Sequence, residues 1–386
     1  MPRTAPPTAR TSGSLMSECI YYLPRLMFLN SRYAPQTHWG DIATVLRDFP
    51  EDSGDVGSPR FWDEWQNRWI AHGERYGALA RDSSTTAGRI RAERGAAVCY
   101  HWAEFMDFGD RQRKLRLRSQ VREHFLRSLK DSELDVTRGE LTVGTGAGQT
   151  PCRVPYWLFL PPSRRAGSQP VPCVVLSNGL DSMTEVEVLA LAEPYLERGI
   201  AALLFDGPGQ GIHVGQVPLL VQMESVVAEL VAVLRRDPRI ADDRLAFFGI
   251  SFGGYFTLRM AQHLGSLFTC LVNLSGGPRV APFDGLPRRL KDDFRFVLAC
   301  GGPVDMQARF DALEIDLTVP AGAPVLSVHG EKDDIFPVTA LEELDRAWGG
   351  KHRLVVHENE AHICPNLVNL WSIDAADWVA DQLRPA

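Results

Sequence analysis

Residues 245–254 read Leu-Ala-Phe-Phe-Gly-Ile-Ser-Phe-Gly-Gly, and this run decides the fold that the sequence predicts. Its first six residues form a short apolar segment, as in a buried strand, and a helical pattern follows the last glycine. The chain must therefore turn sharply at Ser251. Gly249 and Gly253 flank that serine, and small residues at these positions permit a tight turn. The run predicts a strand, a turn and a helix, with Ser251 at the turn.

Short apolar runs alternate with helical patterns along the second part of the chain. The expected strands are 171–176, 200–205, 245–250, 271–274, 324–329 and 353–357. The expected helices are 186–198, 217–236, 255–264, 339–347 and 368–383. Short buried strands separated by helices are typical of a parallel sheet with helices on both faces. The sequence thus predicts an α/β fold built on a mostly parallel, twisted sheet.

The first part of the chain has a different pattern, with apolar side chains at helical spacing and few strand signals. We therefore expect a helical region over 1–135 and an α/β domain over 136–386. The α/β domain should open with an antiparallel hairpin, with strands at 141–143 and 154–160 and a glycine-rich turn at 144–148. Residues 277–318 interrupt the alternation of strands and helices. We interpret them as an insertion near the mouth of a site.

Composition and charge exclude several classes of protein. The 386 residues carry a formal net charge of −7, so no basic excess is present for nucleic acid or an anionic membrane. The arginine-rich run 111–130 also contains apolar residues at helical spacing, and its charges are predicted to form a solvated helix face. No apolar run approaches the ~20 residues of a membrane-spanning helix. We read no secretory signal and expect a soluble, cytoplasmic protein.

Cysteine and glycine patterns give no sign of a metal or nucleotide site. The seven cysteines are scattered without a C-x-x-C pair, so we interpret them as small buried residues in a reducing compartment. The loop 206–211, Asp-Gly-Pro-Gly-Gln-Gly, fits neither G-x-G-x-x-G nor a Walker A pattern, and we interpret it as a tight loop near the site. His357, Glu360 and His362 lack the helical spacing of a zinc motif. We expect no metal and no cofactor.

The turn at Ser251 predicts a nucleophile. A serine hydroxyl needs a general base to take its proton and a carboxylate to orient that base. The chain order for a serine in this strand, turn and helix context is serine, acid, histidine. A loop with Asp333 and Asp334 follows the strand expected at 324–329, and a loop with His362 follows the last expected strand. The order is therefore present.

Within those loops, we assign the acid to Asp333, because the G-x-x-D-x-x-x-P spacing from Gly330 to Pro337 falls on it. Asp334 is the alternative. We assign the base to His362 rather than His357, since His362 lies in the loop beyond the strand and is free to reach the serine.

Two backbone N–H groups are expected to stabilise a developing oxyanion. The first belongs to Phe252, at the N-terminus of the helix that follows the serine. The second comes from the loop after the strand expected at 171–176, where Leu180 or Gly179 is the candidate. Gly179 is also compatible with a role in the turn alone.

These residues, with Gly179-Leu180-Asp181-Ser182 and the loop 206–211, resemble one branch of the α/β-hydrolases. That branch includes dihydropseudooxynicotine hydrolase, the fungal polyketide-shortening hydrolase of melanin biosynthesis and the fermentation-respiration switch protein. The helical segment 97–103 is similar as well, so the resemblance covers nearly the whole chain. The paired G-L-D-S and D-G-P-G-Q-G segments are its most specific part.

The resemblance implies that the helical region is a lid over the catalytic face. Several relatives hydrolyse a carbon–carbon bond beside a ketone, while others act on esters. An expelled carbanion must be protonated, so an accessory acid is implied near the pocket. Asp181 and Glu185 are the candidates, although Asp181 is also suited to cap the helix that begins nearby. Relatives are often dimers, so a homodimer is one implied assembly.

Three functions are compatible with these residues. The leading hypothesis is hydrolysis of an ester, or of a carbon–carbon bond in a β-dicarbonyl, in a medium-sized apolar or aromatic metabolite. One alternative is acyl transfer from an acyl-Ser251 intermediate to an alcohol or amine. The other is a non-catalytic binding protein on a hydrolase scaffold, against which the complete set of Ser251, Asp333 and His362 argues.

Overall fold

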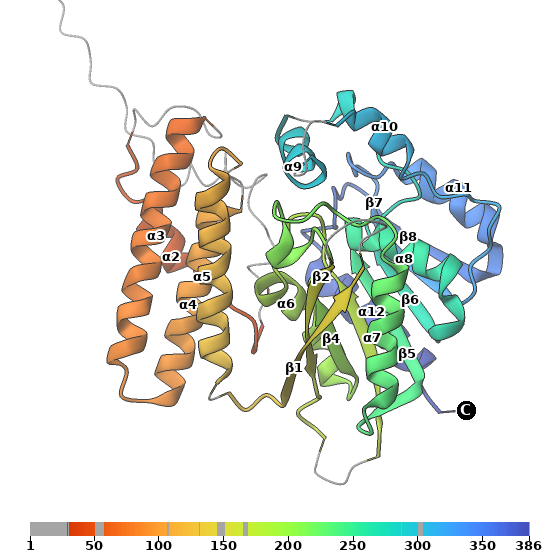
Figure 1. The fold of residues 1–386 in the computed structure, drawn as a ribbon, viewed down its shortest axis with the longest axis horizontal. Coiled ribbons are helices and arrows are strands. Elements are labelled where there is room, and N and C mark those ends of the chain that lie inside the picture. The colour runs from red at the N-terminus through yellow and green to blue at the C-terminus, as the bar shows by residue number, and fades with distance from the viewer. Residues whose placement is uncertain are drawn as a thin grey trace, which may run out of the picture. The chain divides into compact units, whose positions relative to one another are not determined.

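The computed structural model describes residues 29, 31–50, 58–105, 108–130, 132–144, 151–164, 169–286, 288–299 and 304–385. The chain divides into two compact units, Met1–Ser132 and Glu133–Ala386. Figure 1 shows helices in the first unit and a sheet with flanking helices in the second.

The first unit is built from helices that pack along their sides. They are α2 (Trp39–Leu46), α3 (Pro59–Asp82), α4 (Thr86–Glu104) and α5 (Arg111–Leu129). Polar residues fix three of their starts, because the side chains of Ser58, Thr85 and Asp110 each accept a backbone N–H of the first turn. Helix α4 packs against both α3 and α5.

Tryptophans form the core of this unit. Trp65, Trp69 and Trp102 are buried, and the rings of Trp69 and Trp102 stack with centroids 5.1 Å apart. Trp65 Nε1 donates to the carbonyl oxygen of Trp102 at 2.8 Å, and Trp102 Nε1 donates to Thr37 Oγ1 at 2.6 Å. The large rings therefore bury apolar surface, while the N–H groups of Trp65 and Trp102 keep hydrogen-bond partners.

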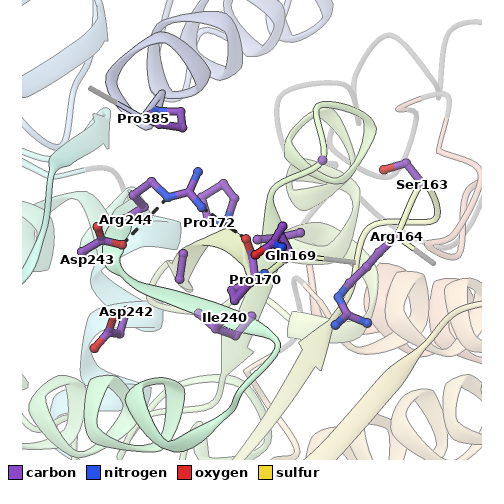
Figure 2. A pocket seen from close by; sticks show the side chains of 13 residues that line it. Ser163, Arg164, Gln169, Pro170, Pro172, Ile240, Asp242, Asp243, Arg244 and Pro385 are labelled. Atoms are coloured by element: carbon purple, nitrogen blue, oxygen red, sulfur yellow. Dashed lines mark hydrogen bonds and ion pairs between the residues drawn. The ribbon is translucent and has the colours of Figure 1, made fainter. Parts of the chain in front are cut away.

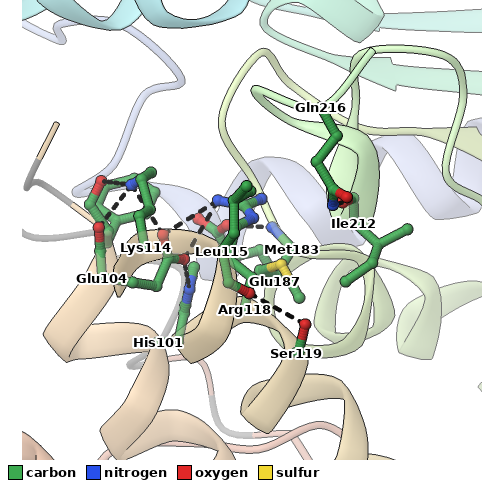
Figure 3. A network of polar contacts seen from close by, with 11 residues as sticks. His101, Glu104, Lys114, Leu115, Arg118, Ser119, Met183, Glu187, Ile212 and Gln216 are labelled. Atoms are coloured by element: carbon green, nitrogen blue, oxygen red, sulfur yellow. Dashed lines mark hydrogen bonds and ion pairs between the residues drawn. The ribbon is translucent and has the colours of Figure 1, made fainter. Parts of the chain in front are cut away.

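The expectation of a fully solvated charged face on α5 is wrong for two of its residues. Lys114 and Arg118 are buried, and both pair with the buried carboxylate of Glu104 on α4 (Figure 3). His101 Nδ1 lies 2.8 Å from the same carboxylate. Burial raises the pKa of Glu104, but the charges of Arg118 and Lys114 outweigh that effect and hold it below its usual range. Charge pairing thus permits these long side chains to enter the interior.

Within the described residues, the second unit contains an eight-stranded sheet in the order β1-β2-β4-β3-β5-β6-β7-β8. The strands are β1 (Val136–Val143), β2 (Cys152–Phe159), β3 (Val171–Ser177), β4 (Ala201–Phe205), β5 (Ile240–Ile250), β6 (Cys270–Leu274), β7 (Val325–Gly330) and β8 (His352–His357). β1 and β2 form the expected antiparallel pair, and β3 to β8 are parallel. Residues 145–148 of the expected glycine-rich turn lie outside the described residues. The mostly parallel α/β fold is confirmed.

Helices cover both faces of this sheet (Figure 1). They include α6 (Leu189–Glu197), α7 (Glu224–Arg236), α8 (Phe252–His263), α11 (Val338–Trp348) and α12 (Val368–Gln382). α7 packs beside α8, and α6 packs beside α12. Two further helices, α9 (Arg288–Leu298) and α10 (Met306–Asp311), lie in the region expected to be an insertion between β6 and β7.

The helix expected at 217–236 begins seven residues late, at Glu224, so the first part of that prediction is wrong. Pro218 lacks the N–H that a helix would use, and the N–H of Leu220 donates to the carbonyl oxygen of Pro208 instead. Leu219 is buried against the backbone of Gly209. Its apolar character therefore reflects burial in a loop and not a helix face.

The structure tests two expectations that came from composition. The cysteines that it describes are free and buried, as expected, namely Cys99, Cys152, Cys173, Cys270 and Cys364. Cys19 and Cys300 lie outside the described residues. Across the described part of the chain, no helix combines the length and apolar character needed to cross a membrane.

Helix α8 packs against the sheet without room for side chains at its glycines. A Cβ atom on Gly253 would lie 2.5 Å from the carbonyl oxygens of Ser177, the last residue of β3, and of Asn178, which follows it. A Cβ atom on Gly254 would meet the side chain of Asn273 and the backbone of Gly276, beyond β6. The first turn of α8 is thus held between the ends of two strands.

We predict that Gly253→Ala destabilises the protein by about 1–3 kcal/mol, because the new methyl group overlaps two backbone oxygens that have little freedom to move. Gly285→Ala is the control, since a Cβ atom there meets nothing within 4 Å. Urea denaturation followed by circular dichroism measures both free energies of unfolding. Equal stability of the two variants would contradict the packing described here.

Two buried histidines lie in the neighbouring strands β7 and β8. His329 Nε2 donates to the carbonyl oxygen of Phe336 at 2.8 Å, and His352 lies 2.8 Å from Asp345 and 2.7 Å from Ser327 Oγ. Burial lowers the pKa of His329, outweighing the opposing effects of Asp333 and of the bond to Phe336. Burial likewise lowers the pKa of His352 more than Asp345 raises it. Both imidazoles are therefore neutral in the folded protein at pH 7.

This arrangement predicts that the free energy of unfolding falls as the pH is lowered from 7 to 5. In the unfolded chain these histidines have a pKa near 6.5, so they gain protons at a higher pH than they do in the folded protein. The stability that is present above about pH 6.5 is therefore lost as the pH falls toward the lower pKa values of the folded state. His329→Gln keeps a donor for Phe336 and should flatten the dependence. His263→Gln, at an exposed position, should keep the wild-type slope. Identical slopes for all three proteins would overturn the prediction.

Candidate active site

Ser251 lies at the sharp turn between β5 and α8. Its backbone has φ 58° and ψ −117°, and its N–H donates to the carbonyl oxygen of Leu274 at 2.7 Å. A residue with a side chain adopts positive φ only under constraint. The constraint here comes from Gly249, where a Cβ atom would overlap the carbonyl group of Gly253. The turn presents the serine beyond the carboxyl end of its strand.

The structure brings Ser251, His362 and Asp333 into one chain of hydrogen bonds. His362 Nε2 lies 2.8 Å from Ser251 Oγ, and His362 Nδ1 lies 2.7 Å from Asp333 Oδ2. A carboxylate can only accept, so Nδ1 carries the proton and Nε2 is left to accept the serine proton. This is the tautomer that a general base requires.

Asp333 is the carboxylate that the fold delivers, and Asp334 is exposed. Asp333 Oδ1 accepts the N–H groups of Ile335 and Phe336, each at 2.9 Å. Burial raises the pKa of Asp333, but the charge and hydrogen bond of His362 outweigh it, so the pKa is below its usual value. The acid is therefore ionised and rigidly oriented, which suits it to hold the imidazole.

The loop that carries His362 is anchored on both sides of the histidine. The N–H of Ile363 donates to Ser275 Oγ at 2.9 Å, and the N–H of Lys332 donates to the carbonyl oxygen of Glu360 at 2.8 Å. Ile363 has φ 64°, and Ser275 has φ 50°. These strained positions are fixed by the bonds around them, and they hold the imidazole between serine and acid.

The two segments from which the sequence predicts oxyanion donors both adjoin Ser251. Phe252 is the first residue of α8, and its N–H is one of the first-turn groups that have no partner inside the helix. Gly179 lies against the turn, since a Cβ atom on it would be 3.4 Å from Ser251 Cβ. The loop with Gly179 and Leu180 is thus adjacent to the serine.

The expected accessory acids lie in the following segment. Asp181 is half-buried, and Glu185 is buried in a short π-helix, η3 (Thr184–Val188). Asp181 is not the N-cap residue of this helix, because that position is Met183, whose N–H donates to Glu187 Oε2 at 3.1 Å. A π-helix is rare and marks functional sites more often than chance. Sequence patterning predicts an ordinary helix here and misses it.

Sequence reasoning also missed a buried polar network below this loop. Asp206 Oδ1 accepts the hydroxyl of Thr184 at 2.6 Å and the amide of Asn178 at 3.1 Å. Gln210 donates to the backbone of Asn178 and Gly179. The D-G-P-G-Q-G run is the sequence signal that could have indicated this network, because its Asp206 and Gln210 make these buried hydrogen bonds.

Aromatic side chains surround the serine turn on the side of the expected insertion. The ring of Phe252 lies 6.3 Å from that of Phe294 on α9 and 6.4 Å from that of Phe336. Phe336 also stacks on the imidazole of His362 at 6.2 Å. Phe310 on α10 extends the cluster, 4.8 Å from Phe294. The region 277–318 thus contributes Phe294 and Phe310 to a buried aromatic cluster around Phe252, the residue after Ser251.

Among the described residues, neither a metal centre nor a second pocket belongs to the site at Ser251. No group of three histidine, cysteine, aspartate or glutamate side chains among them is arranged to hold a metal ion. The groove in Figure 2 opens at the amino ends of the strands, where Ile240 begins β5. Ser251 follows the opposite, carboxyl end of the same strand.

The chain is similar to several known hydrolases. It is 27% identical to 2,6-dihydropseudooxynicotine hydrolase of Paenarthrobacter nicotinovorans over 330 residues, which cover 84% of each chain. It is 37% identical to 20-hydroxy-prefusarin hydrolase of Gibberella moniliformis over 115 residues, or 28% of this chain and 27% of that protein.

A solved structure shows the fold over most of the chain. The crystal structure of a 2,6-dihydroxy-pseudo-oxynicotine hydrolase matches with a TM-score of 0.75 at 23% identity, covering 90% of this chain and 93% of that one. Together with the sheet order described above, this likeness establishes an α/β-hydrolase fold.

The sequence profile of FrsA-like esterases matches residues 73–310, which is more than half of the chain. This match and the named relatives confirm the resemblance that the sequence motifs indicated. The chain therefore belongs to the FrsA-like esterase family of α/β-fold hydrolases.

Proposed function

We propose that this enzyme is a serine hydrolase in which Ser251 is the nucleophile, His362 the general base and Asp333 the acid that orients it. The observation that carries the proposal is the unbroken hydrogen-bond chain from Asp333 through His362 to Ser251 Oγ. These hydrogen bonds reach Ser251 at a strained turn, directly before the N-terminus of α8. Nucleophile, base and oxyanion donors are then within reach of one carbonyl carbon.

The reaction proceeds in two halves. Ser251 Oγ attacks the substrate carbonyl carbon while its proton passes to His362 Nε2, and the resulting oxyanion accepts hydrogen bonds from Phe252 N–H and from Leu180 or Gly179. The tetrahedral adduct expels an alkoxide or a ketone-stabilised carbanion, which takes the proton from His362. Water then attacks the acyl-enzyme and gives a proton to His362. The second tetrahedral adduct collapses to the carboxylic acid, and the departing Ser251 Oγ takes the proton back from His362.

The proposed substrate is a medium-sized apolar or aromatic ester or ketone metabolite. The rings of Phe252, Phe294 and Phe336 are buried together beside the serine turn, and this apolar surrounding supports an apolar or aromatic substrate. The names of two relatives specify 2,6-dihydropseudooxynicotine and 20-hydroxy-prefusarin as what those hydrolases act on. We extend to this chain only the common class of organic metabolite. A homodimer and a lid role for the helical unit stay predictions.

Replacement of the nucleophile tests the reaction itself. We expect Ser251→Ala to reduce kcat/KM on p-nitrophenyl esters, and on β-diketones if these are turned over, by about 10⁵-fold or more, because no other group can form the acyl-enzyme. Initial rates on the two substrate series measure this. Turnover that survives the substitution would refute the mechanism. A folded wild-type protein without turnover on either series would favour a binding role.

Replacement of the acid separates the two aspartates of one loop. Asp333→Asn leaves the imidazole with the wrong tautomer and should reduce kcat by about 10⁴-fold. Asp334→Asn changes a neighbouring carboxylate that is exposed and should leave kcat at the wild-type value. Steady-state kinetics of the two folded variants decides the matter. The reverse ranking would assign the acid to Asp334.

A further inference from the structure

The loop that follows β3, next to Ser251, accepts two hydrogen bonds from one buried side-chain amide, that of Gln210. Gln210 Nε2 donates to the carbonyl oxygen of Asn178 at 2.6 Å and to that of Gly179 at 3.2 Å. Asn178 and Gly179 follow β3, whereas Gln210 lies in the loop after the neighbouring strand β4. Gln210 is fully buried. One side chain therefore fixes two successive carbonyl groups of the oxyanion loop.

Those two bonds also fix the direction of two N–H groups. The described peptide bonds include no cis bond, and in a trans peptide the N–H points opposite to the carbonyl of the same plane. The carbonyl of Asn178 shares its plane with the N–H of Gly179, and the carbonyl of Gly179 shares its plane with the N–H of Leu180. Both N–H groups therefore point away from Gln210.

The backbone of Gln210 is itself held in place. The N–H of Gln210 donates to the carbonyl oxygen of Gly207 at 2.9 Å, which closes the turn within the loop. A Cβ atom on Gly207 would lie 2.9 Å from Gln210 Oε1, so the turn packs directly on the side chain. Asp206 ties the side chain of Asn178 in the same network. Hydrogen bonds thus hold both the backbone of Gln210 and the side chain of Asn178, whose carbonyl oxygen Gln210 contacts.

We propose that Gln210 is a positioning residue for the oxyanion site, which aims the N–H groups of Gly179 and Leu180 at the oxyanion formed on Ser251. Gly179 already lies against the serine, as its 3.4 Å Cβ approach to Ser251 Cβ indicates. The inference rests on the proposed function, because it needs a tetrahedral adduct on that serine. Gln210 acts on the transition state through the loop, without contacting the substrate.

Gln210→Met keeps the length of the side chain and removes both hydrogen bonds. We expect kcat to fall about 10²-fold, comparable with the loss of one oxyanion donor, while KM changes little because the ground-state carbonyl depends less on these donors. Inhibition by an arylboronic acid, which forms a tetrahedral adduct with the serine, should weaken by a similar factor. Gln210→Leu, which also lacks both donors, should show the same pattern.

Gln262 offers a matched control at a distance from the serine. Its Nε2 also donates to two backbone carbonyls, those of Asp316 and Val319, each at 2.8 Å. It lies eleven residues beyond Ser251, at the far end of α8. Gln262→Met should lower the Tm as Gln210→Met does, but leave kcat and boronic acid inhibition at the wild-type values.

The outcomes separate this inference from the proposed function. Folded Gln210 variants with wild-type kcat and boronic acid affinity would overturn the inference, as would equal kcat losses in the Gln210 and Gln262 variants. A fall in kcat confined to the Gln210 variants, with KM preserved, supports it. If Ser251→Ala itself kept activity, the proposed function would fail first, independently of Gln210.

Discussion

The backbone of Ser251, with φ 58° and ψ −117°, is the constraint on which the site depends. Such a conformation costs on the order of 1–3 kcal/mol for a residue with a side chain, and it persists only where the surroundings enforce it. Here the enforcement is close packing, because α8 contacts the ends of β3 and β6 at glycines that have no room for a methyl group. The same packing brings the loop with Gly179 against the serine.

The other loops of the site converge because parallel strands end at one edge of the sheet. Asp333 follows β7 and His362 follows β8, and the two loops touch at Gly330, where a Cβ atom would overlap the carbonyl of Ala361. His362 keeps the pKa of the buried Asp333 below its usual value, and the N–H groups of Ile335 and Phe336 orient its carboxylate. The imidazole therefore has a fixed anion on one side and a fixed hydroxyl on the other.

Much of this arrangement could be predicted from the sequence. Apolar runs of strand length gave every strand expected between 171 and 357, and the spacing from Gly330 to Pro337 pointed to Asp333, which the fold places beside His362. Such patterns report burial and turn chemistry, which are local. The same patterns wrongly predicted a helix at 217–223, because Leu219 is apolar and buried in a loop rather than on a helix face.

Features that depend on contacts between distant loops could not be predicted in this way. The tie from Gln210 to Asn178 spans 32 residues, and the pairing of Lys114 and Arg118 with Glu104 joins two helices. Neither contact produces a periodic pattern of apolar residues in the sequence, because its partners are brought together only by tertiary packing. The π-helix at Thr184–Val188 is similar, since one extra residue per turn does not change the apolar pattern enough to be recognised.

The most direct test of the central claim is to identify the residue that a fluorophosphonate labels. Peptide mass spectrometry of the treated, folded protein should place one phosphonyl group on Ser251, and denatured protein should not react, because only the turn and His362 activate that hydroxyl. A phosphonyl group on another residue, or no label on folded protein, would contradict the claim that Ser251 is the nucleophile.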